Sequence, residues 1–371
     1  MRIAIDLTSL ADNFSGIERF ALNISKELIT LDKINNYILI FKNSVHEEFK
    51  KFIDSENVEV KVLKGNKKLY FNQVILMRNL YKIKADRYLF FAFQSPILFR
   101  RKGIINTIHD LTPWDYPNTM KLLSKIYFKI SILDSIKKSK EIITVSEFSK
   151  RRIKEKFNSN SNLIYCGISD VFLNKENNYE ESEVILNKYG IQNDYLMCLC
   201  TLEPRKNIDI LVKSFIELKD EHKISDDCKL VLVGRRGWKV EKLINEISSE
   251  YSKDIIVTGF VDDEDIPLIY KKSKCFVFPS LYEGFGIPVL EAMSMGTPVV
   301  ASNTSAIPEV LGKDYKYMFE NNNKEDLKKK ILEMLALDKD ELKVISTKEK
   351  EKSKEFCWRS EAEKVLTLLK R

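Results

Sequence analysis

The stretch that decides the fold is Cys275-Phe-Val-Phe-Pro-Ser-Leu-Tyr-Glu-Gly-Phe-Gly-Ile-Pro-Val-Leu-Glu-Ala-Met-Ser-Met-Gly-Thr-Pro-Val-Val-Ala301. Its first four residues are apolar and predict a buried strand, and Pro298–Ala301 predict a second one. The loop after the first strand contains two glycines, and Pro288 then stands at the expected first position of a helix over residues 288–295. A strand, a helix and a strand in this order form a βαβ unit, which indicates a parallel sheet.

The same alternation extends through the rest of the chain. Continuous apolar strands separated by amphipathic helices are typical of parallel sheets that helices cover on both faces. The strands fall into two series, and each series predicts a doubly wound α/β domain. The first series is Arg2–Leu7, Tyr37–Phe41, Val58–Leu63, Tyr88–Phe93, Ile104–Ile108 and Ile142–Val145, and the second is Tyr195–Cys200, Lys229–Val233, Ile255–Thr258, Cys275–Phe278 and Pro298–Ala301.

A polar stretch without periodicity, residues 174–183, separates the two series and is predicted to be the linker. We therefore expect one Rossmann-like domain over residues 1–172 and a second over residues 173–354. A last amphipathic helix is predicted within residues 355–371, where the apolar positions are Phe356, Trp358, Val365, Leu368 and Leu369.

Composition excludes several classes of protein. The chain has 371 residues of which 44% are hydrophobic, so it is globular and long enough for two cores, and neither disordered nor collagen-like. Its six cysteines form no C-x-x-C motif and no zinc-ligand spacing, which favours reduced thiols in the cytoplasm. The longest apolar stretch, Tyr88–Phe99, is shorter than the ~20 residues that a membrane helix needs. Asp6 lies where a signal peptide would need an apolar core.

The loop and helix after Cys275–Phe278 are the strongest candidate for a binding site, because ligands of parallel sheets bind outside the carboxyl ends of the strands. Glycines in the loop let a ligand approach the backbone, and the free amides of a helix N-terminus attract phosphate. Glu291, about one turn into the helix, suits two adjacent ribose hydroxyls. Glu283 in the loop suits the hydroxyls of a second ring. The alternative is a plain loop–helix junction with Glu291 favoured by the helix dipole.

Arg205 and Lys206 follow the predicted strand Tyr195–Cys200 in the same way. Cations at the start of a helix oppose the helix dipole, so two of them there indicate an anionic partner such as a diphosphate. The alternative is that both are solvated surface cations.

Two further candidates lie in the first series. His109 ends the strand Ile104–Ile108 and could hydrogen-bond a sugar hydroxyl, although a lone histidine is also compatible with a structural role. Gly16 lies between the first strand and the first helix and could bring the backbone close to a phosphate. A G-x-G-x-x-G motif is absent there, which argues against a nicotinamide dinucleotide.

With these residues the sequence resembles the retaining glycosyltransferases of family 4, which have the GT-B fold, and among them bacterial polysaccharide mannosyltransferases. The E-x7-E motif from Glu283 to Glu291 and the segment Glu203-Pro-Arg-Lys-Asn207 carry the resemblance most specifically. Other matching segments are Ile108-His-Asp110, Ile143-Thr-Val-Ser-Glu-Phe-Ser149, Val233-Gly234 and Val257-Thr-Gly-Phe-Val261. Ser15-Gly-Ile-Glu-Arg19 is similar to a G-I-G-R stretch of the family, with Glu18 in place of the second glycine.

The resemblance implies a role for each candidate. Arg205 and Lys206 would bind the donor diphosphate, Glu291 the ribose and Glu283 the donor sugar. His109 would touch the transferred sugar, and Gly16 would lie at the phosphates. Backbone groups would complete the donor site at Gly284, Phe285, Gly286, Phe260 and Val261. The two domains would face a cleft, and the last helix would cross back to the first domain.

The resemblance also implies that no metal and no other cofactor is needed. Asp263-Glu-Asp265 is formally a D-x-D motif, of the kind that binds metal in another glycosyltransferase fold. It stands at a predicted helix start, where acidic residues suit the helix dipole.

The positive charge is concentrated in the first half, since residues 1–170 carry 29 Lys+Arg against 18 Asp+Glu, whereas residues 171–371 carry 32 against 36. Residues 61–102 alone contain eleven Lys+Arg and one acid, Asp86, interleaved with aromatics. Such a segment suits nucleic acid or an anionic membrane. The resemblance favours the membrane, at its inner face, over nucleic acid. The alternative is a solvated helix face beside buried aromatics.

Together these features predict a hexosyltransferase that moves mannose or a similar hexose from GDP-mannose or a UDP-sugar to a saccharide or lipid-linked saccharide in O-antigen or capsule synthesis. It would be cytoplasmic, or peripheral on the inner face of the membrane. One alternative is an enzyme similar to UDP-sugar 2-epimerases. Another is a non-catalytic accessory subunit that binds a sugar nucleotide.

Overall fold

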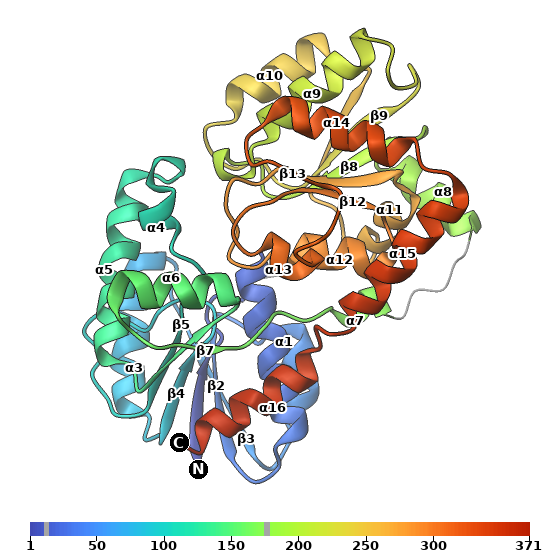
Figure 1. Cartoon of the computed structure of the whole chain (residues 1–371). Helices are drawn as coiled ribbons and strands as arrows, with labels where there is room; N and C mark the ends of the chain where they lie inside the picture. Colours follow the sequence, from blue (N-terminus) through green and yellow to red (C-terminus); the bar gives the residue numbers. More distant parts are fainter. Residues whose placement is uncertain (11–14, 174–178) are drawn as a thin grey trace. The chain divides into compact units, whose positions relative to one another are not determined.

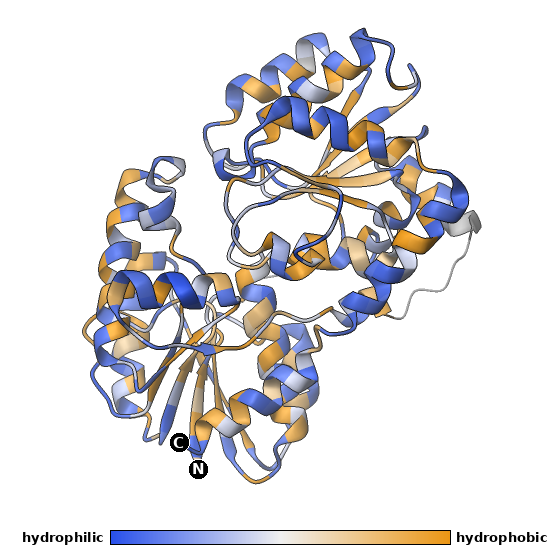
Figure 2. Cartoon of the chain, viewed as in Figure 1, coloured by the Kyte–Doolittle hydropathy of each residue, from blue (hydrophilic) through white to orange (hydrophobic). Residues whose placement is uncertain are grey.

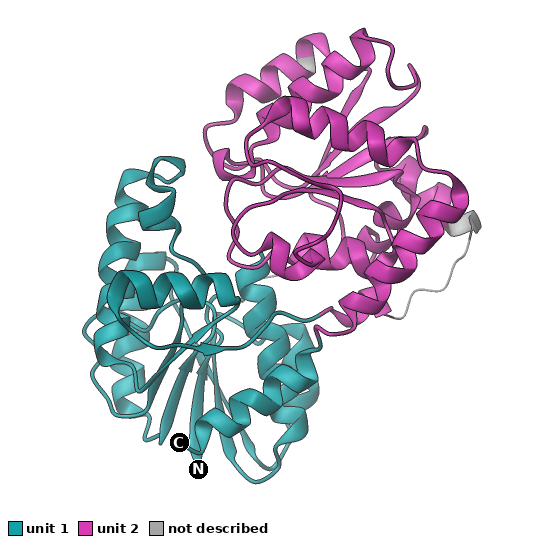
Figure 3. Cartoon of the chain, viewed as in Figure 1, with its two compact units in different colours: residues 1–167, 357–371 teal, residues 168–356 magenta. Residues whose placement is uncertain are grey.

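The computed structural model describes residues 1–10, 15–173 and 179–371. They form two compact units (Figure 3). Unit 1 consists of residues 1–167 and 357–371, and unit 2 consists of residues 168–356. Each unit is a parallel sheet with helices on both faces (Figure 1), as the two series of strands predict.

The described residues of unit 1 form a seven-stranded sheet with the order β3-β2-β1-β4-β5-β6-β7. Its strands are β1 (Arg2–Asp6), β2 (Asn36–Lys42), β3 (Val58–Leu63), β4 (Arg87–Phe90), β5 (Ile104–Thr107), β6 (Glu141–Thr144) and β7 (Asn162–Leu163). The helices are α1 (Gly16–Leu31), η1 (Glu47–Phe52), α2 (Lys68–Tyr70), the π-helical turn η2 (Phe71–Leu76), α3 (Met77–Lys82), α4 (Thr112–Asp115), η3 (Pro117–Thr119), α5 (Leu122–Lys138), α6 (Glu147–Phe157) and α16 (Trp358–Leu369).

The described part of unit 2 has a six-stranded sheet with the order β10-β9-β8-β11-β12-β13. Its strands are β8 (Tyr195–Leu199), β9 (Lys229–Val233), β10 (Ile255–Gly259), β11 (Cys275–Phe278), β12 (Val299–Ser302) and β13 (Met318–Phe319). The helices are α7 (Asp170–Leu173), α8 (Tyr179–Lys188), η4 (Pro204–Lys206), α9 (Ile208–Asp220), α10 (Glu241–Glu250), α11 (Ile266–Lys272), α12 (Ile287–Met295), α13 (Ile307–Leu311), α14 (Lys324–Leu335) and α15 (Lys339–Ser353).

The central strands are buried because they carry few polar side chains and helices cover both of their faces, whereas the edge strands β3, β7 and β10 are only partly buried. All four residues of β11 and all four of β12 are buried, and Figure 2 shows the central strands of both sheets in the colour of hydrophobic residues. The strand register is parallel throughout, for example Phe276 opposite Val299. Burial of apolar area of this kind is the main stabilising contribution to the fold.

The strand order places the candidate site. In each sheet the order reverses between two central strands, β1 and β4 in unit 1 and β8 and β11 in unit 2. Ligands of such sheets bind at this point, outside the carboxyl ends of the strands. The segment after β8 and the segment after β11 are therefore neighbours, although about 80 residues separate them in the sequence.

The predicted strands and long helices are confirmed, with three corrections. The units meet in sequence at 167/168 instead of 172/173. Ile168 already belongs to unit 2, where its N–H donates to the Phe356 carbonyl, 3.3 Å away. The chain returns to unit 1 at residue 357 instead of 355. The predicted linker 174–183 is helical from Tyr179 in α8, and its residues 174–178 lie outside the described residues.

The last helix crosses back to unit 1, as the resemblance implies. α16 packs against α1, where the rings of Trp358 and Phe20 lie 5.8 Å apart and edge-on. The Glu361 side chain, buried in this helix, accepts a hydrogen bond of 2.9 Å from the Tyr165 backbone amide. The helix is therefore part of the core of unit 1.

Candidate active site

The ends of β8 and β11 bring Arg205, Lys206 and Glu283 together. Lys206 Nζ lies 2.6 Å from Glu283 Oε1, and Arg205 Nη1 lies 3.0 Å from Glu283 Oε2. Both carboxylate oxygens are thus bonded to a cation. A backbone hydrogen bond of 2.9 Å from Leu281 N–H to the Arg205 carbonyl joins the two segments. The sequence predicts each of these residues as a site residue, and the structure places the three in one cluster.

Glu283 is ionised in this cluster. It is only 7% exposed, and burial by itself raises the pKa of a carboxyl group. The charges of Lys206 and Arg205 oppose this effect and lower the pKa of Glu283 to about 2. The backbone amide of Glu283 also donates a 2.7 Å hydrogen bond to Ser305 Oγ. The carboxylate is therefore fixed in place and charged at neutral pH.

Arg205 is held on a second side by Glu203. Its Nε and Nη2 donate to Glu203 Oε1 at 3.2 and 2.9 Å, while Nη1 also donates to the Tyr282 carbonyl at 2.8 Å. Lys206 Nζ lies 5.1 Å from the centroid of the Phe278 ring, a cation–π contact. These hydrogen bonds fix the orientation of the guanidinium.

The glycine loop leads into α12 through a conformation that only glycine adopts readily. Gly286 is the N-cap of α12 and has φ 111°. A Cβ atom added to it would meet Ile307 Cδ1 at 2.7 Å. Gly284 and Phe285 precede it and are buried, and the Phe285 ring packs edge-on against Phe356 with centroids 5.5 Å apart. The start of α12 is thus fixed by packing on both sides.

Glu291 lies one turn into α12 and is 5% exposed. The Tyr270 hydroxyl lies 3.2 Å from Glu291 Oε2 and 3.1 Å from the Pro288 carbonyl. Tyr270 belongs to α11, so this hydroxyl links the carboxylate to a second helix. A carboxylate held in this way is a preorganised acceptor for hydroxyl groups.

Phe260 and Val261 follow β10, at the edge of the sheet in unit 2. Phe260 is 45% exposed and its ring lies 5.0 Å from the guanidinium carbon of Arg235, whereas Val261 is buried. An exposed aromatic ring stacked with arginine is a suitable surface for a planar base. Arg235 did not emerge from the sequence as a site residue, although it directly follows the matching segment Val233-Gly234.

The candidates of unit 1 lie at the carboxyl ends of its strands. His109 follows β5, is half-buried, and its Nε2 lies 2.8 Å from the Phe91 carbonyl oxygen. Burial lowers the pKa of this imidazole, so it is neutral at pH 7. The Phe20 ring packs edge-on against it at 5.3 Å. Asp110 accepts a 2.8 Å bond from the Thr112 amide, so its carboxylate orders the loop after β5.

Gly16 is the first residue of α1 and is exposed. The preceding Ser15 and the following Glu18 form a capping box, in which the Ser15 amide donates a 3.0 Å bond to Glu18 Oε2. Glu18, which stands in place of the second glycine of the family pattern, therefore accepts a hydrogen bond from a backbone amide at the start of the helix.

Sequence reasoning missed Glu203 and Tyr270 as supporting residues. Glu203 stands inside the matching segment Glu203-Pro-Arg-Lys-Asn207. Its carboxylate, two residues before Arg205, could have indicated from the sequence that the two side chains form an ion pair. Tyr270 gives no such signal, because only the packing of α11 beside α12 brings its hydroxyl to Glu291.

The second aspartate of the D-x-D motif, Asp265, has a structural explanation, which it shares with the preceding Asp262. Lys188 Nζ lies 2.8 Å from Asp265 Oδ2 and 2.8 Å from Asp262 Oδ2, and the Tyr189 hydroxyl lies 2.8 Å from Asp265 Oδ2. Within the described ranges, no group of three or more His, Cys, Asp or Glu side chains has the arrangement that a metal ion needs.

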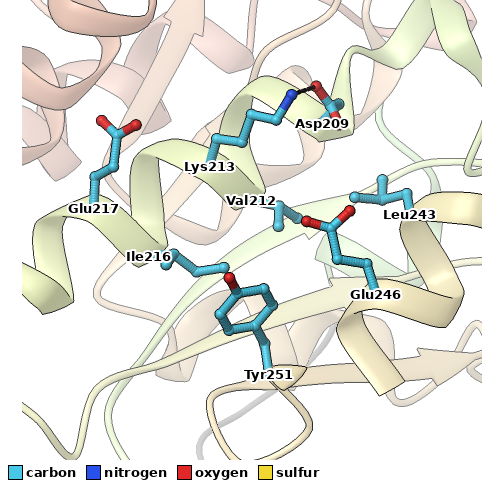
Figure 4. Close-up of a pocket in the computed structure, with 8 residues that line it drawn as sticks. All are labelled: Asp209, Val212, Lys213, Ile216, Glu217, Leu243, Glu246 and Tyr251. Atoms are coloured by element: carbon cyan, nitrogen blue, oxygen red, sulfur yellow. Dashed lines mark hydrogen bonds and ion pairs between the residues drawn. The ribbon is translucent and has the colours of Figure 1, made fainter. Parts of the chain in front are cut away.

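A pocket of about 220 Å³ lies elsewhere in unit 2 (Figure 4). Eight residues of α9, α10 and the following position line it, and Lys213 forms a 2.6 Å ion pair with Asp209 at its rim. None of the predicted donor-site residues is among them. The candidate site is therefore identified by its side chains rather than by this pocket.

Solved structures share the fold of this chain. The whole chain superimposes with a TM-score of 0.75 on Anabaena HepE, crystallised with UDP and glucose, at 16% identity and over 99% of that chain. It superimposes over 99% of both chains, with a TM-score of 0.74 and 13% identity, on WaaG, a glycosyltransferase involved in lipopolysaccharide biosynthesis. These likenesses establish the two-domain GT-B fold.

Sequence relatives establish the enzyme class. Residues 180–351 match the family model of glycosyl transferases group 1, and this range contains Arg205, Lys206, Glu283 and Glu291. The chain is 27% identical to O-antigen chain mannosyltransferase B of Escherichia coli over 96% of both chains.

The chain is a GT-B glycosyltransferase.

A second relative of this glycosyltransferase is the O-antigen chain mannosyltransferase RfbU of Salmonella typhimurium. The identity is 29%, over 59% of this chain and 57% of RfbU. The described residues of the glycosyltransferase include no helix that is both long and apolar enough to cross a bilayer.

Proposed function

We propose that this glycosyltransferase is a retaining hexosyltransferase of surface-polysaccharide synthesis, with mannose as the first candidate sugar and GDP-mannose as the first candidate donor. The named O-antigen mannosyltransferases of Escherichia coli and Salmonella typhimurium support the sugar and the pathway class. A solved neighbour that holds UDP-glucose supports a nucleoside-diphosphate sugar as the donor class and leaves a UDP-sugar as the second candidate.

The observation that carries the proposal is the cluster of Arg205, Lys206 and Glu283 beside the start of α12. When the bond from the sugar to the diphosphate breaks, negative charge develops on the leaving phosphate. Two oriented cations and the amides of a helix N-terminus stabilise that charge without having to reorganise. Glu203 and Glu283 form ion pairs with the two cations and so balance their charge.

Each remaining site residue has a proposed task. Glu291, held by Tyr270, accepts hydrogen bonds from the two ribose hydroxyls. Glu283 has lone pairs left after binding Arg205 and Lys206, so it also accepts bonds from hydroxyls of the donor sugar. Backbone amides of Gly284, Phe285 and Gly286 lie beside that sugar, and the Phe260–Val261 backbone borders the base.

In unit 1 we propose that His109 contacts the transferred sugar as a neutral imidazole and that Gly16 lies at the phosphates. The acceptor hydroxyl attacks from the face that the leaving group occupies, and a phosphate oxygen takes its proton, so the configuration at the anomeric carbon is retained. This route uses no carboxylate nucleophile and no metal ion.

The acceptor is proposed to be a saccharide or lipid-linked saccharide at the inner face of the cell membrane. The support is the excess of cations over residues 61–102, several of which, such as Lys64, Lys67 and Arg78, are exposed. A sugar-nucleotide 2-epimerase is not favoured, because the relatives over the full length of the chain are transferases.

The deciding experiment incubates the purified protein with a panel of nucleotide sugars and measures release of the nucleoside diphosphate. One donor, GDP-mannose first, should be hydrolysed slowly. Glu291→Ala should lose most donor binding and activity, whereas Glu325→Ala, an exposed carboxylate at the start of α14, should behave as the wild type. Unchanged turnover by Glu291→Ala would contradict the assignment of the site.

A further inference from the structure

Arg235 is an exposed arginine at the carboxyl edge of the sheet in unit 2, and the proposed function gives it no task. It follows β9, and Phe260 follows the neighbouring strand β10. The strand on the other side of β9 is β8, which leads to Arg205 and Lys206. Because the carboxyl ends of parallel strands meet at one edge of a sheet, Arg235 and Phe260 share this edge with the two cations.

The backbone of Arg235 is held against the segment that follows β8. The Leu202 amide donates a 2.9 Å hydrogen bond to the Arg235 carbonyl, and the Gly237 amide donates a 2.8 Å bond to the Leu202 carbonyl. Gly234 has φ 133°, and a Cβ atom added to it would lie 1.9 Å from the Cys200 carbonyl oxygen. Only glycine allows this close approach, so the Arg235 side chain starts from a fixed place beside the chain that carries the two cations.

The Arg235 guanidinium is oriented by an aromatic ring and has no acidic partner. Its central carbon lies 5.0 Å from the centroid of the Phe260 ring, over the ring. Among the residues that the structure describes, no side chain forms an ion pair or a hydrogen bond with this guanidinium. A cation–π contact uses the face of the guanidinium and leaves the N–H groups at its edge available. Arg205, by contrast, is bonded to two carboxylates.

A fork of N–H donors distinguishes nucleobases by the acceptors that they present side by side. Guanine presents O6 and N7, which an arginine binds as a pair. Adenine presents N7 beside the N6 amino group, which is itself a donor and opposes an arginine. Uracil, like thymine, presents O4 with no ring acceptor next to it. Guanine is therefore the base whose edge suits a free guanidinium.

We infer that Arg235 selects guanine as the base of the donor nucleotide. It donates to O6 and N7 of the base, while the contact with Phe260 holds the plane of the guanidinium. The inference rests on the proposed function, from which it takes only that a nucleoside-diphosphate sugar binds at this edge of unit 2. It goes further by replacing two candidate donor classes with one, the guanine nucleotides.

The test is calorimetric titration of the full chain with GDP, UDP, ADP and 7-deaza-GDP, in which a C–H group replaces N7. The wild type should bind GDP about tenfold or more tightly than UDP or ADP. It should bind 7-deaza-GDP about fivefold more weakly than GDP, because one of the two acceptors is lost. This comparison needs no variant and is independent of any effect of mutation on folding.

Arg235→Met removes the fork and keeps an apolar stem. It should lower the affinity for GDP about tenfold, change the affinity for UDP less than about twofold, and bind GDP and 7-deaza-GDP alike. Arg235→Lys keeps the charge without the planar fork and should recover little of the loss. The matched control is Arg236→Met, which removes the adjacent exposed arginine and should bind every nucleotide as the wild type does. Circular dichroism should be unchanged in all variants.

Tighter binding of UDP or ADP than of GDP by the wild type would overturn the inference and leave a hexosyltransferase with another donor. Equal losses of GDP and UDP affinity in Arg235→Met, or full recovery in Arg235→Lys, would also overturn it, because the contact would then be made with the diphosphate. Binding of none of these nucleotides would contradict the proposed function itself, so the two failures are distinguishable.

Discussion

Arg205 is held between two carboxylates, Glu203 and Glu283, and this arrangement restricts the orientation of its guanidinium group. A guanidinium on a free side chain would lose rotamer freedom on binding a diphosphate. Here hydrogen bonds to Glu283 and Glu203 already hold the guanidinium in one orientation. Lys206 is fixed in the same way on Glu283. The site therefore enters the reaction with its two cations in place.

Glu203→Gln should impair the chemical step more than donor binding. The amide keeps the shape but weakens a charge-assisted contact worth about 1.5–3 kcal/mol. We expect kcat to fall about tenfold or more, with a change in donor KM of less than about threefold, in steady-state assays.

Glu203→Asp should recover part of the lost kcat, and Glu217→Gln, a carboxylate on α9, should leave both constants unchanged. A rise in KM at constant kcat would show that Glu203 supports binding alone.

Glu349 is a buried carboxyl group outside the site. Burial raises its pKa to about 8, against the weaker opposite effects of the Tyr315 hydroxyl and the Val299 amide. Its Oε2 is buried, and among the described residues no side chain or amide bonds it. At neutral pH the group is therefore protonated in the folded protein and ionised in the unfolded chain.

This pKa predicts that stability falls as pH rises from about 4.5 to about 8, the interval in which the folded state binds the additional proton. The loss should be of the order of a few kcal/mol, measured by urea unfolding at a series of pH values. Glu349→Gln should flatten the profile in this interval and be more stable than the wild type at pH 8. Asp6, whose pKa burial raises to about 6, contributes equally to both proteins. Parallel profiles of variant and wild type would refute the prediction.

At the scale of elements, the junction between β11 and α12 is the most constrained part of unit 2. The loop must bring Glu283 to the cations, turn at Gly286 and start a helix on which Glu291 reaches Tyr270. Gly286 is constrained twice, because its φ as the N-cap is positive and because Ile307 of α13 leaves no room for a Cβ atom. The geometry of the proposed donor site thus depends on the packing of α12 between α11 and α13.

Gly286→Ala should destabilise the protein by about 1–3 kcal/mol and weaken donor binding, because the new Cβ is strained by φ and clashes with Ile307. Urea unfolding and donor titration measure the two effects.

Gly190→Ala is the matched control. Gly190 has φ 73° but no atom within 4 Å of the added Cβ, so it carries the backbone strain without the clash. Equal losses of stability in both variants would show that the contact with Ile307 does not matter.

At the scale of the whole molecule, unit 1 is discontinuous in sequence. Residues 357–371 complete a core whose strands all come from the first 167 residues. Trp358, Ala362, Val365 and Leu369 of α16 are buried, and the Gly167 backbone packs against the Trp358 ring closely enough to exclude a Cβ.

Trp358→Ala should therefore destabilise unit 1 selectively. Loss of a buried Trp side chain costs about 3–5 kcal/mol, so hydrogen exchange should accelerate in α1 and β1 but not in β8 or α12. Arg359→Ala, one residue further and exposed, should leave exchange unchanged. Faster exchange in both units would contradict a core role confined to unit 1.

Much of this organisation could be predicted from sequence. The central strands are mostly apolar, and even the edge strand β3 alternates Glu59 and Lys61 with valines. Their positions therefore followed from composition, and the residues after β8 and β11 followed from the rule that ligands bind at the carboxyl ends of strands. The pairing of Arg205 with Glu283 could not be predicted in the same way, because it depends on β8 and β11 being neighbours across a crossover.

Two features escaped sequence reasoning for physical reasons. The boundary at residue 167 depends on tertiary contacts between distant parts of the chain, such as the hydrogen bond from Ile168 to Phe356. The exposure of Leu122, Leu123, Ile126, Ile130 and Leu133 on α5 could not be predicted either. The helix carries apolar residues on both faces, and periodicity alone does not distinguish a face in the core from one in solvent.

The crossing of the last helix has a consequence for the order in which the protein matures on the ribosome. Unit 2 is one continuous segment and has all of its residues once position 356 has left the exit tunnel. Unit 1, although most of it is synthesised first, lacks the helix α16 of its core until residues 357–371 emerge. The usual vectorial order, in which the N-terminal domain folds first, is thus reversed for the final packing step. Until residues 357–371 have emerged, α1 has an apolar face that a chaperone can bind.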